Sequence, residues 1–197
     1  MRSRYAIAAS ALLLLMPMGG TAAATKSVTI GDFFFNPAGT TASQNDTLTW
    51  TNTGGATHTT TSAFPRPFGW SSGDLRTGAR FSTVLTAAGT YSYRCVRHSN
   101  MTGSAKVPIR VTPSTGGATT KFTIRVATGP APSGFDFIIE RKPPGATSFA
   151  VWRSTPSASV TFVPDQGRGT YSFRSSVRKL STGQTVAPSL PRSITVS

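Results

Sequence analysis

The sequence predicts an all-β fold built as two successive β-sandwiches, on three observations. Glycine, proline, serine and threonine are abundant and only 13% of the 197 residues are charged, which suits short strands and many turns better than helices. Several short stretches alternate apolar with polar residues, the period expected when one face of a strand is buried. No amphipathic helical pattern of useful length accompanies them.

The first 24 residues differ from the rest and are predicted to be a secretory signal peptide. Arg2 and Arg4 give a positive start, an apolar run spans residues 6–16, and three alanines at 22–24 offer a cleavage site. The apolar run is shorter than the ~20 residues of a membrane-spanning helix, although an uncleaved anchor is the alternative. We therefore expect an exported protein, periplasmic, extracellular or associated with the cell envelope, with no transmembrane segment after cleavage.

Residues 25–113 are predicted to form the first sandwich. Its clearest strands are 47–51, 91–95 and 106–111, where one set of alternate positions is apolar. Turn-forming residues separate the strands, as at Asn36-Pro37 and Gly54-Gly55.

A second sandwich is predicted over residues 119–197, after a Ser-Thr-Gly-Gly-Ala linker at 114–118. Six short strands are expected, at 121–127, 135–142, 149–153, 159–163, 170–177 and 193–196. The segment resembles a fibronectin type III or immunoglobulin-like module, because Gly169–Arg174 suits a tyrosine corner and residues 193–196 suit a closing strand. No full first strand is evident, so the module is expected to be truncated.

One short stretch occurs twice. Gly89–Cys95 aligns with Gly169–Ser175, and the alternative to a shared origin is convergence on the same corner. The second copy has Ser175 in place of Cys95, and the second unit contains no histidine.

The charge is strongly basic but dispersed. The net charge is +14, yet no run of lysine and arginine exceeds two residues. Nucleic-acid binders usually concentrate their charge on one element, so a nucleic-acid partner is not expected. The basic surface predicts acidic redox-partner proteins or association with an anionic envelope. A solvated basic surface without a dedicated partner is the alternative.

The counts of cysteine and histidine exclude several site types. One cysteine cannot form an intramolecular disulfide, and two histidines cannot supply a three-histidine zinc site or a second copper centre. Oxidase or nitrite reductase activity is therefore not expected, and the protein is predicted not to be an enzyme.

The scarce ligand types nevertheless converge on one pattern. Cys95, His98 and Met101 follow one another as Cys-x2-His-x2-Met, and His58 lies 37 residues before Cys95. One thiolate, two imidazoles and a weak axial thioether form the ligand set of an electron-transfer copper site. Zinc is the main competitor, but structural zinc sites generally contain more than one cysteine. A single copper ion, cycling between Cu(I) and Cu(II), is the predicted cofactor.

Residues 25–113 resemble a cupredoxin, a blue type 1 copper protein of the plastocyanin–amicyanin kind. The resemblance rests on Phe35-Asn36-Pro37, residues 46–52, His58-Thr59, residues 72–75, Gly78, Phe81, Gly89-Thr90-Tyr91, the loop 95–101 and Gly103. It implies a Greek-key β-sandwich with copper near one end. It also implies His58, Cys95 and His98 as equatorial ligands and Met101 as the axial ligand.

The sequence departs from that family at three informative positions. Arg97 and Ser99 flank the loop histidine where many relatives have a proline, and the cation at Arg97 is expected to raise the reduction potential. Thr59 follows the upstream histidine where some relatives have an asparagine, and its hydroxyl is expected to join the ligand loops less firmly. An apolar cluster, Phe64, Pro65, Phe68 and Trp70, is expected either in the core or around the edge of the metal site.

Three functions remain open at this point. The first is a one-electron carrier outside the cytoplasm. The second is a copper storage or delivery protein that uses the same ligands. The third is an extracellular binding or adhesion protein whose C-terminal sandwich recognises a protein or glycan.

Overall fold

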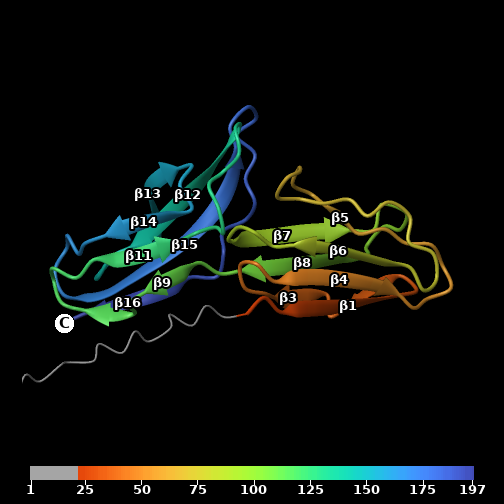
Figure 1. Cartoon of the computed structure of the whole chain (residues 1–197), viewed down its shortest axis with the longest axis horizontal. Coiled ribbons are helices and arrows are strands. Elements are labelled where there is room, and N and C mark those ends of the chain that lie inside the picture. The colour runs from red at the N-terminus through yellow and green to blue at the C-terminus, as the bar shows by residue number, and fades with distance from the viewer. Residues whose placement is uncertain (1–21) are drawn as a thin grey trace, which may run out of the picture.

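The computed structural model describes residues 22–197, and all regular structure in that range is β-strand, as predicted. The predicted signal peptide lies outside the described residues except for its last three. Within the described range no helix is long and apolar enough to cross a membrane. Figure 1 shows two β lobes placed end to end, the first holding β1–β8 and the second holding the later strands.

The first lobe is a sandwich of two four-stranded sheets. One sheet has the order β2 (Phe34–Asn36), β1 (Thr25–Gly31), β4 (Thr47–Asn52) and β6 (Arg80–Val84). The other has the order β3 (Gly39–Thr41), β8 (Thr102–Val107), β7 (Gly89–Arg94) and β5 (Thr61–Ser62). The β1–β4 and β3–β8 ladders are parallel.

Alternation along these strands fills the core of the first lobe. Leu48 and Trp50 on β4 are buried, as are Tyr91 and Tyr93 on β7, while the residues between them are less buried or exposed. The period-two pattern of the sequence therefore places one face of each sheet inward, as expected for a sandwich.

The second lobe packs a three-stranded sheet against a five-stranded sheet. The smaller has the order β14 (Ser159–Phe162), β11 (Phe122–Arg125) and β9 (Arg110–Thr112). The larger has the order β10 (Thr115–Gly116), β16 (Arg192–Val196), β15 (Gly169–Lys179), β12 (Phe135–Lys142) and β13 (Ala150–Thr155). All six strands predicted between residues 121 and 196 are present, and β12 has the predicted bounds.

The predicted unit boundary differs from the observed strand pairing. The expected strand 106–111 is two strands, because Pro108 separates β8 from β9 and has no N–H to continue the ladder. β9 pairs with β11 of the second lobe, and β10, inside the predicted linker 114–118, pairs with β16. β9 is thus a strand of the second lobe that precedes the predicted segment 119–197. The division into 25–113 and 119–197 stays a prediction, with strand pairing crossing its border.

The two similar stretches build the same local contact in each lobe. The Tyr91 hydroxyl donates to the Ala87 carbonyl at 3.0 Å, and the Tyr171 hydroxyl donates to the Gly167 carbonyl at 2.8 Å. Each tyrosine thus bonds to the residue four positions earlier, and the predicted corner at Tyr171 is confirmed.

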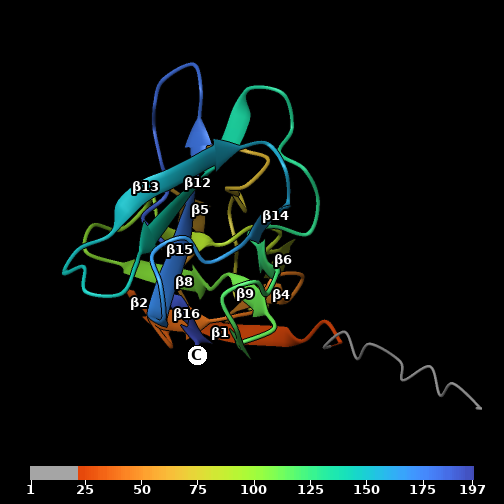
Figure 2. The same cartoon turned by 90° about the vertical axis from the view of Figure 1, so that its left-hand side faces the viewer.

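The lobes are joined by backbone bonds and aromatic contacts. The Thr90 N–H donates to the Ala187 carbonyl at 2.8 Å, at the start of β7. The rings of Phe64 and Phe68 pack edge-on against Phe135 of the second lobe. Figure 2 turns the molecule so that the second lobe faces the viewer, in front of the first lobe. The opposite end of β7, which leads to Cys95, lies about 17 Å further along the strand.

The apolar cluster predicted near residues 64–70 therefore belongs to the core and to the junction between lobes. Trp70 is buried and packs against Trp50, Tyr91 and Tyr93. Phe64 is buried against Phe135 of the second lobe. Of the two expected locations, the cluster thus occupies the core, and it also extends across the lobe boundary.

Candidate metal centre

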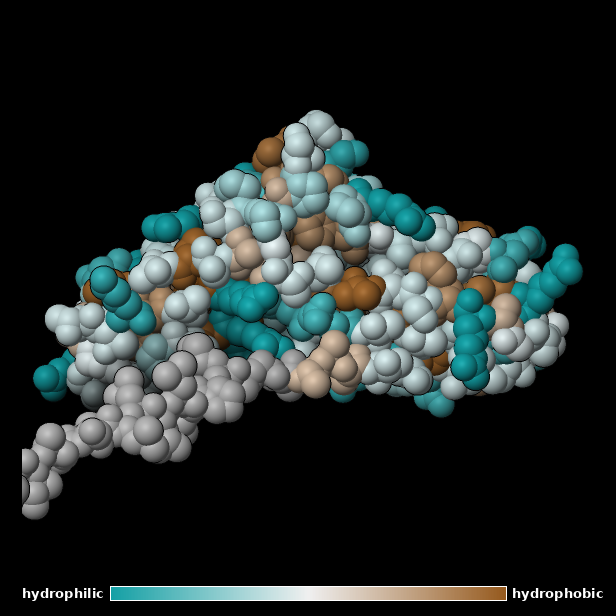
Figure 3. Space-filling model, in the orientation of Figure 1, coloured by the Kyte–Doolittle hydropathy of each residue, from teal (hydrophilic) through white to brown (hydrophobic). Residues whose placement is uncertain are grey.

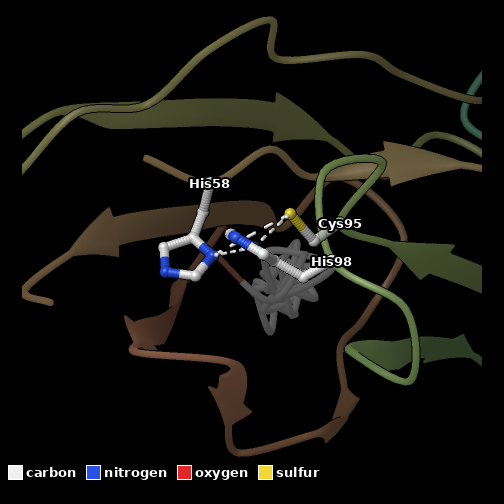
Figure 4. Close-up of side chains that lie close together, drawn as sticks. All are labelled: His58, Cys95 and His98. Carbon is white, nitrogen blue, oxygen red and sulfur yellow. Dashed lines mark hydrogen bonds between the residues drawn. The ribbon is translucent and has the colours of Figure 1, made fainter. Parts of the chain in front are cut away.

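Three predicted ligands meet at the far end of the first lobe. Cys95 directly follows β7, and His98 lies in the loop that leads to β8. His58 lies between β4 and β5, where its N–H and C=O both bond to Leu75. Figure 4 shows the sulfur of Cys95 and one ring nitrogen of each histidine directed toward the same point.

The three ligand atoms form a triangle of the size that a metal ion requires. The two Nδ1 atoms lie 3.1 Å apart, and the Cys95 Sγ lies 3.4 Å from His98 Nδ1 and 3.8 Å from His58 Nδ1. With metal–nitrogen and metal–sulfur bonds of about 2.0 and 2.3 Å, a trigonal ion would space its ligands about 3.5 and 3.7 Å apart. The His58, Cys95 and His98 cluster can therefore hold one ion, and its ligand types suit copper.

Burial covers two of the three clustered side chains and favours the neutral form of the upstream histidine. His58 and Cys95 are 0% and 2% exposed, whereas His98 is partly exposed. Burial, together with the facing imidazole of His98, lowers the pKa of His58 below its ordinary value, and the nearby Asp32 opposes that shift only in part. A neutral imidazole has a free lone pair on one nitrogen, which metal binding requires.

Thr59 joins the two ligand-bearing segments, as predicted. Its backbone N–H donates to the Cys95 sulfur at 3.3 Å, and its hydroxyl accepts the Val96 N–H at 2.8 Å. Hydrogen bonds to a ligand sulfur influence the reduction potential of a thiolate–copper site. Thr59, which follows His58, thus helps to position Cys95, and Val96, which follows Cys95, helps to position His58.

Met101, the predicted axial ligand, is placed by the same loop. Its side chain is buried, and its carbonyl accepts the Cys95 N–H at 3.0 Å. This backbone bond closes the loop that carries Cys95 and His98. Coordination by the Met101 sulfur stays a prediction.

The turn between β1 and β2 contributes two residues that the sequence analysis missed. Asp32 Oδ1 lies 3.7 Å from His58 Nε2. The ring of Phe33 meets His98 edge-on at 4.9 Å between centroids and His58 at 6.1 Å. Neither contact has a sequence signal beyond the turn itself, because the partners lie far apart along the chain.

Arg97, the cation beside the loop histidine, is paired with a carboxylate from another loop. Its guanidinium makes two hydrogen bonds to the Asp74 carboxylate, and this pairing lowers the pKa of Asp74. Asp74 directly precedes Leu75, which is bonded to His58. The ion pair connects the loop 95–101 to a second loop, and the effect of Arg97 on the reduction potential stays a prediction.

No protein-family model and no curated protein matches this chain. Similar solved structures include a purple cupredoxin from Nitrosopumilus maritimus, which is 26% identical, covers 41% of this chain and 97% of its own, and has a TM-score of 0.38. A reduced amicyanin mutant is 22% identical over 46% of this chain and 86% of its own, with a TM-score of 0.39. A Cu(I) amicyanin mutant is 22% identical over 42% of this chain and 81% of its own, with a TM-score of 0.40.

Proposed function

We propose that this protein is an exported one-electron carrier that binds one copper ion through His58, Cys95 and His98, with Met101 as a weak axial ligand. The observation that carries the proposal is the triangle of two imidazole nitrogens and one sulfur, with sides of 3.1, 3.4 and 3.8 Å. Bound copper supplies reversible exchange of one electron between Cu(I) and Cu(II), for which this ligand set is suited.

The residues around the triangle support a carrier rather than a storage site. The Cys95 sulfur accepts an N–H from Thr59, and the segments that hold the ligands are bonded to each other. A site held from several sides changes little when an electron enters or leaves, which favours fast transfer. A storage site gains nothing from such rigidity, because it must open to release its ion.

His98 is the proposed point of electron entry and exit. It is the only partly exposed member of the triangle in the described structure, since His58 and Cys95 are buried. A partner that docks on this end would approach the His98 edge, at the end of the lobe distant from the second sandwich.

The charge distribution supports an acidic partner protein. Five of the six acidic residues lie within ion-pair distance of an arginine or of His58, and the sixth, Asp46, accepts two backbone N–H groups. Most lysines and arginines of residues 22–197 therefore have no carboxylate partner. Uncompensated positive charge favours encounter with an acidic surface at low salt.

Expression with copper followed by visible spectroscopy tests the proposal. We expect one copper per chain, an intense visible absorption band that disappears on reduction and returns on oxidation, and no band in Cys95→Ser. A fully copper-loaded wild type without such a band would contradict the carrier function and leave storage or delivery as the better assignment. A chain that retains zinc in preference to copper would contradict both the carrier function and the storage or delivery function.

A further inference from the structure

The Nε2 atom of His58 faces the carboxylate of Asp32, which lies in the turn between β1 and β2. His58 Nδ1 is directed toward Cys95 and His98, whereas Nε2 is directed away from them (Figure 4). Nε2 is buried and has no hydrogen-bond partner among the described residues. The carboxylate oxygen Oδ1 of Asp32 lies 3.7 Å away, slightly beyond hydrogen-bond distance.

Asp32 is held in this place by the loop that precedes His58. The Ala56 N–H donates to Asp32 Oδ1 at 2.9 Å. A Cβ atom on Gly54 would lie 2.3 Å from that same oxygen, so only glycine admits the carboxylate at this position. The Gly54-Gly55 turn therefore has a specific role: it allows Asp32 to approach the backbone beside the histidine.

The neighbouring Phe33, in the same turn, also contacts the candidate site. Phe33 has a φ of 71°, a left-handed conformation that costs free energy for a residue with a bulky side chain. This conformation places its ring against both imidazoles. The turn thus places the negative charge of Asp32 near His58 Nε2 and the ring of Phe33 against both imidazoles.

We propose that Asp32 is a positioning residue for His58: its carboxylate, 3.7 Å from Nε2, favours a proton on that nitrogen through its negative charge and so selects the tautomer with a free Nδ1 lone pair. Carboxylates behind metal-binding histidines orient the ring and increase the electron donation of the ligand nitrogen. A more strongly donating ligand favours Cu(II) over Cu(I). The tautomer assignment depends only on the protein, whereas the effect on copper rests on the proposed function.

The Asp32→Asn variant tests both parts, because its amide oxygen still accepts the Ala56 N–H while the negative charge is lost. In the copper-free protein, nitrogen NMR of the His58 ring is expected to show the Nε2–H tautomer and a slowly exchanging Nε2 proton. Asp32→Asn is expected to populate the other tautomer and to speed proton exchange. In the copper-loaded protein, the variant is expected to lose about tenfold more affinity for Cu(II) than for Cu(I), which raises the reduction potential by about 59 mV.

Asp165→Asn is the matched charge control, because Asp165 pairs with Arg141 in the second lobe. It should leave the His58 tautomer and the reduction potential unchanged. Unchanged tautomer and proton exchange in Asp32→Asn would overturn the proposal, as would an equal shift in potential for both variants. If Asp32→Asn does not fold, Asp32→Ser gives the same tautomer measurement. A protein that binds no copper would refute the proposed function, while the NMR result would still decide the role of Asp32.

Discussion

The hydroxyl of Thr59 accepts a hydrogen bond from the backbone N–H of Val96, and this contact joins two segments that lie 37 residues apart. Thr59 follows His58, and Val96 follows Cys95. The bond therefore fixes the distance between two proposed ligands before any metal binds. The structure thus shows hydrogen bonds between the two segments that carry His58 and Cys95, two of the proposed ligands.

Removing the Thr59 hydroxyl should weaken the fold and loosen the triangle. Thr59→Val leaves the Val96 N–H without its acceptor, so we expect the free energy of unfolding of the metal-free protein to fall by about 1–3 kcal/mol. The visible band of the copper-loaded variant should shift or broaden, because the Cys95 sulfur is held less firmly. Denaturant unfolding and visible spectroscopy measure the two effects. Thr59→Ser keeps the hydroxyl and should retain most of the wild-type behaviour, and equal stability of Thr59→Val and wild type would refute the role of the bond.

Breaking the ion pair between Asp74 and Arg97 should raise the reduction potential. Asp74→Asn frees the Arg97 cation beside the proposed ligands, and an uncompensated positive charge disfavours Cu(II). Because both side chains are about half exposed, salt should screen the effect. Voltammetry at low and high salt measures it: the difference from wild type should shrink as salt is added, and Asp74→Asn with Arg97→Gln should approach wild type. A shift of the same size at all salt concentrations would argue against this electrostatic cause.

Shortening Phe33 should admit water to the histidine pair. Phe33→Ala removes a ring that contacts both imidazoles, so we expect a loss of about 0.5–1.5 kcal/mol in unfolding free energy. The reduction potential should fall, since water favours the more highly charged Cu(II) state. Phe34→Ala is the control, because Phe34 is also about half exposed but its ring lies over Gly31. Equal potentials for the two variants would show that Phe33 does not shield the site.

Local alternation was enough to predict the fold class and most strands. β12 has the bounds expected from its sequence, and the inward side chains of β4 and β7 are those that the period of two selected. Alternation failed at β9, since its apolar residues continue the pattern of β8 across Pro108 although the two strands belong to different lobes. Which sheet a short strand joins is decided by long-range pairing, and that information is absent from a local pattern.

The candidate site was predictable only for residues whose type is scarce. His58, Cys95 and His98 could be named because the chain has two histidines and one cysteine, and the structure brings them together. Their binding of copper stays a prediction. Asp32 was not predictable, because a carboxylate in a turn is common and its relation to His58 arises only when β1 and β4 pair.

The stability of the fold should fall above pH 10 because of two of its buried tyrosines, Tyr91 and Tyr93. Burial raises the pKa of Tyr91 and of Tyr93 above 10, the ordinary value. The folded state therefore keeps protons that the unfolded state releases, so stability is fully present below pH 10 and is lost as the pH rises further. Each tyrosine should contribute a slope of about 1.4 kcal/mol per pH unit to the unfolding free energy.

Tyr91→Phe separates this effect from general alkaline damage. The variant loses the hydrogen bond to Ala87, so it should be about 1 kcal/mol less stable at neutral pH. Its alkaline slope should be smaller than that of the wild type by the contribution of one tyrosine. Denaturant titrations between pH 8 and pH 11 measure the slopes, and parallel curves would show that Tyr91 does not remain protonated in the folded state.

Removing the second lobe should leave the metal site intact but destabilise the first lobe. Thr90, at the start of β7, bonds to Ala187, whereas Cys95 lies beyond the other end of the strand, so the ligand triangle needs no contact from residues 114–197. Truncation after Ile109, which removes β9 with the rest of the second lobe, would, however, expose Phe64 and Phe68, whose rings pack against Phe135. We expect a protein with an unchanged visible band, a lower denaturation midpoint and a greater tendency to aggregate. Phe64→Ser with Phe68→Ser should restore solubility to the truncated protein without changing the band. Loss of the band on truncation would show that the second lobe shapes the site, and the two lobes would then have to be treated as one functional unit.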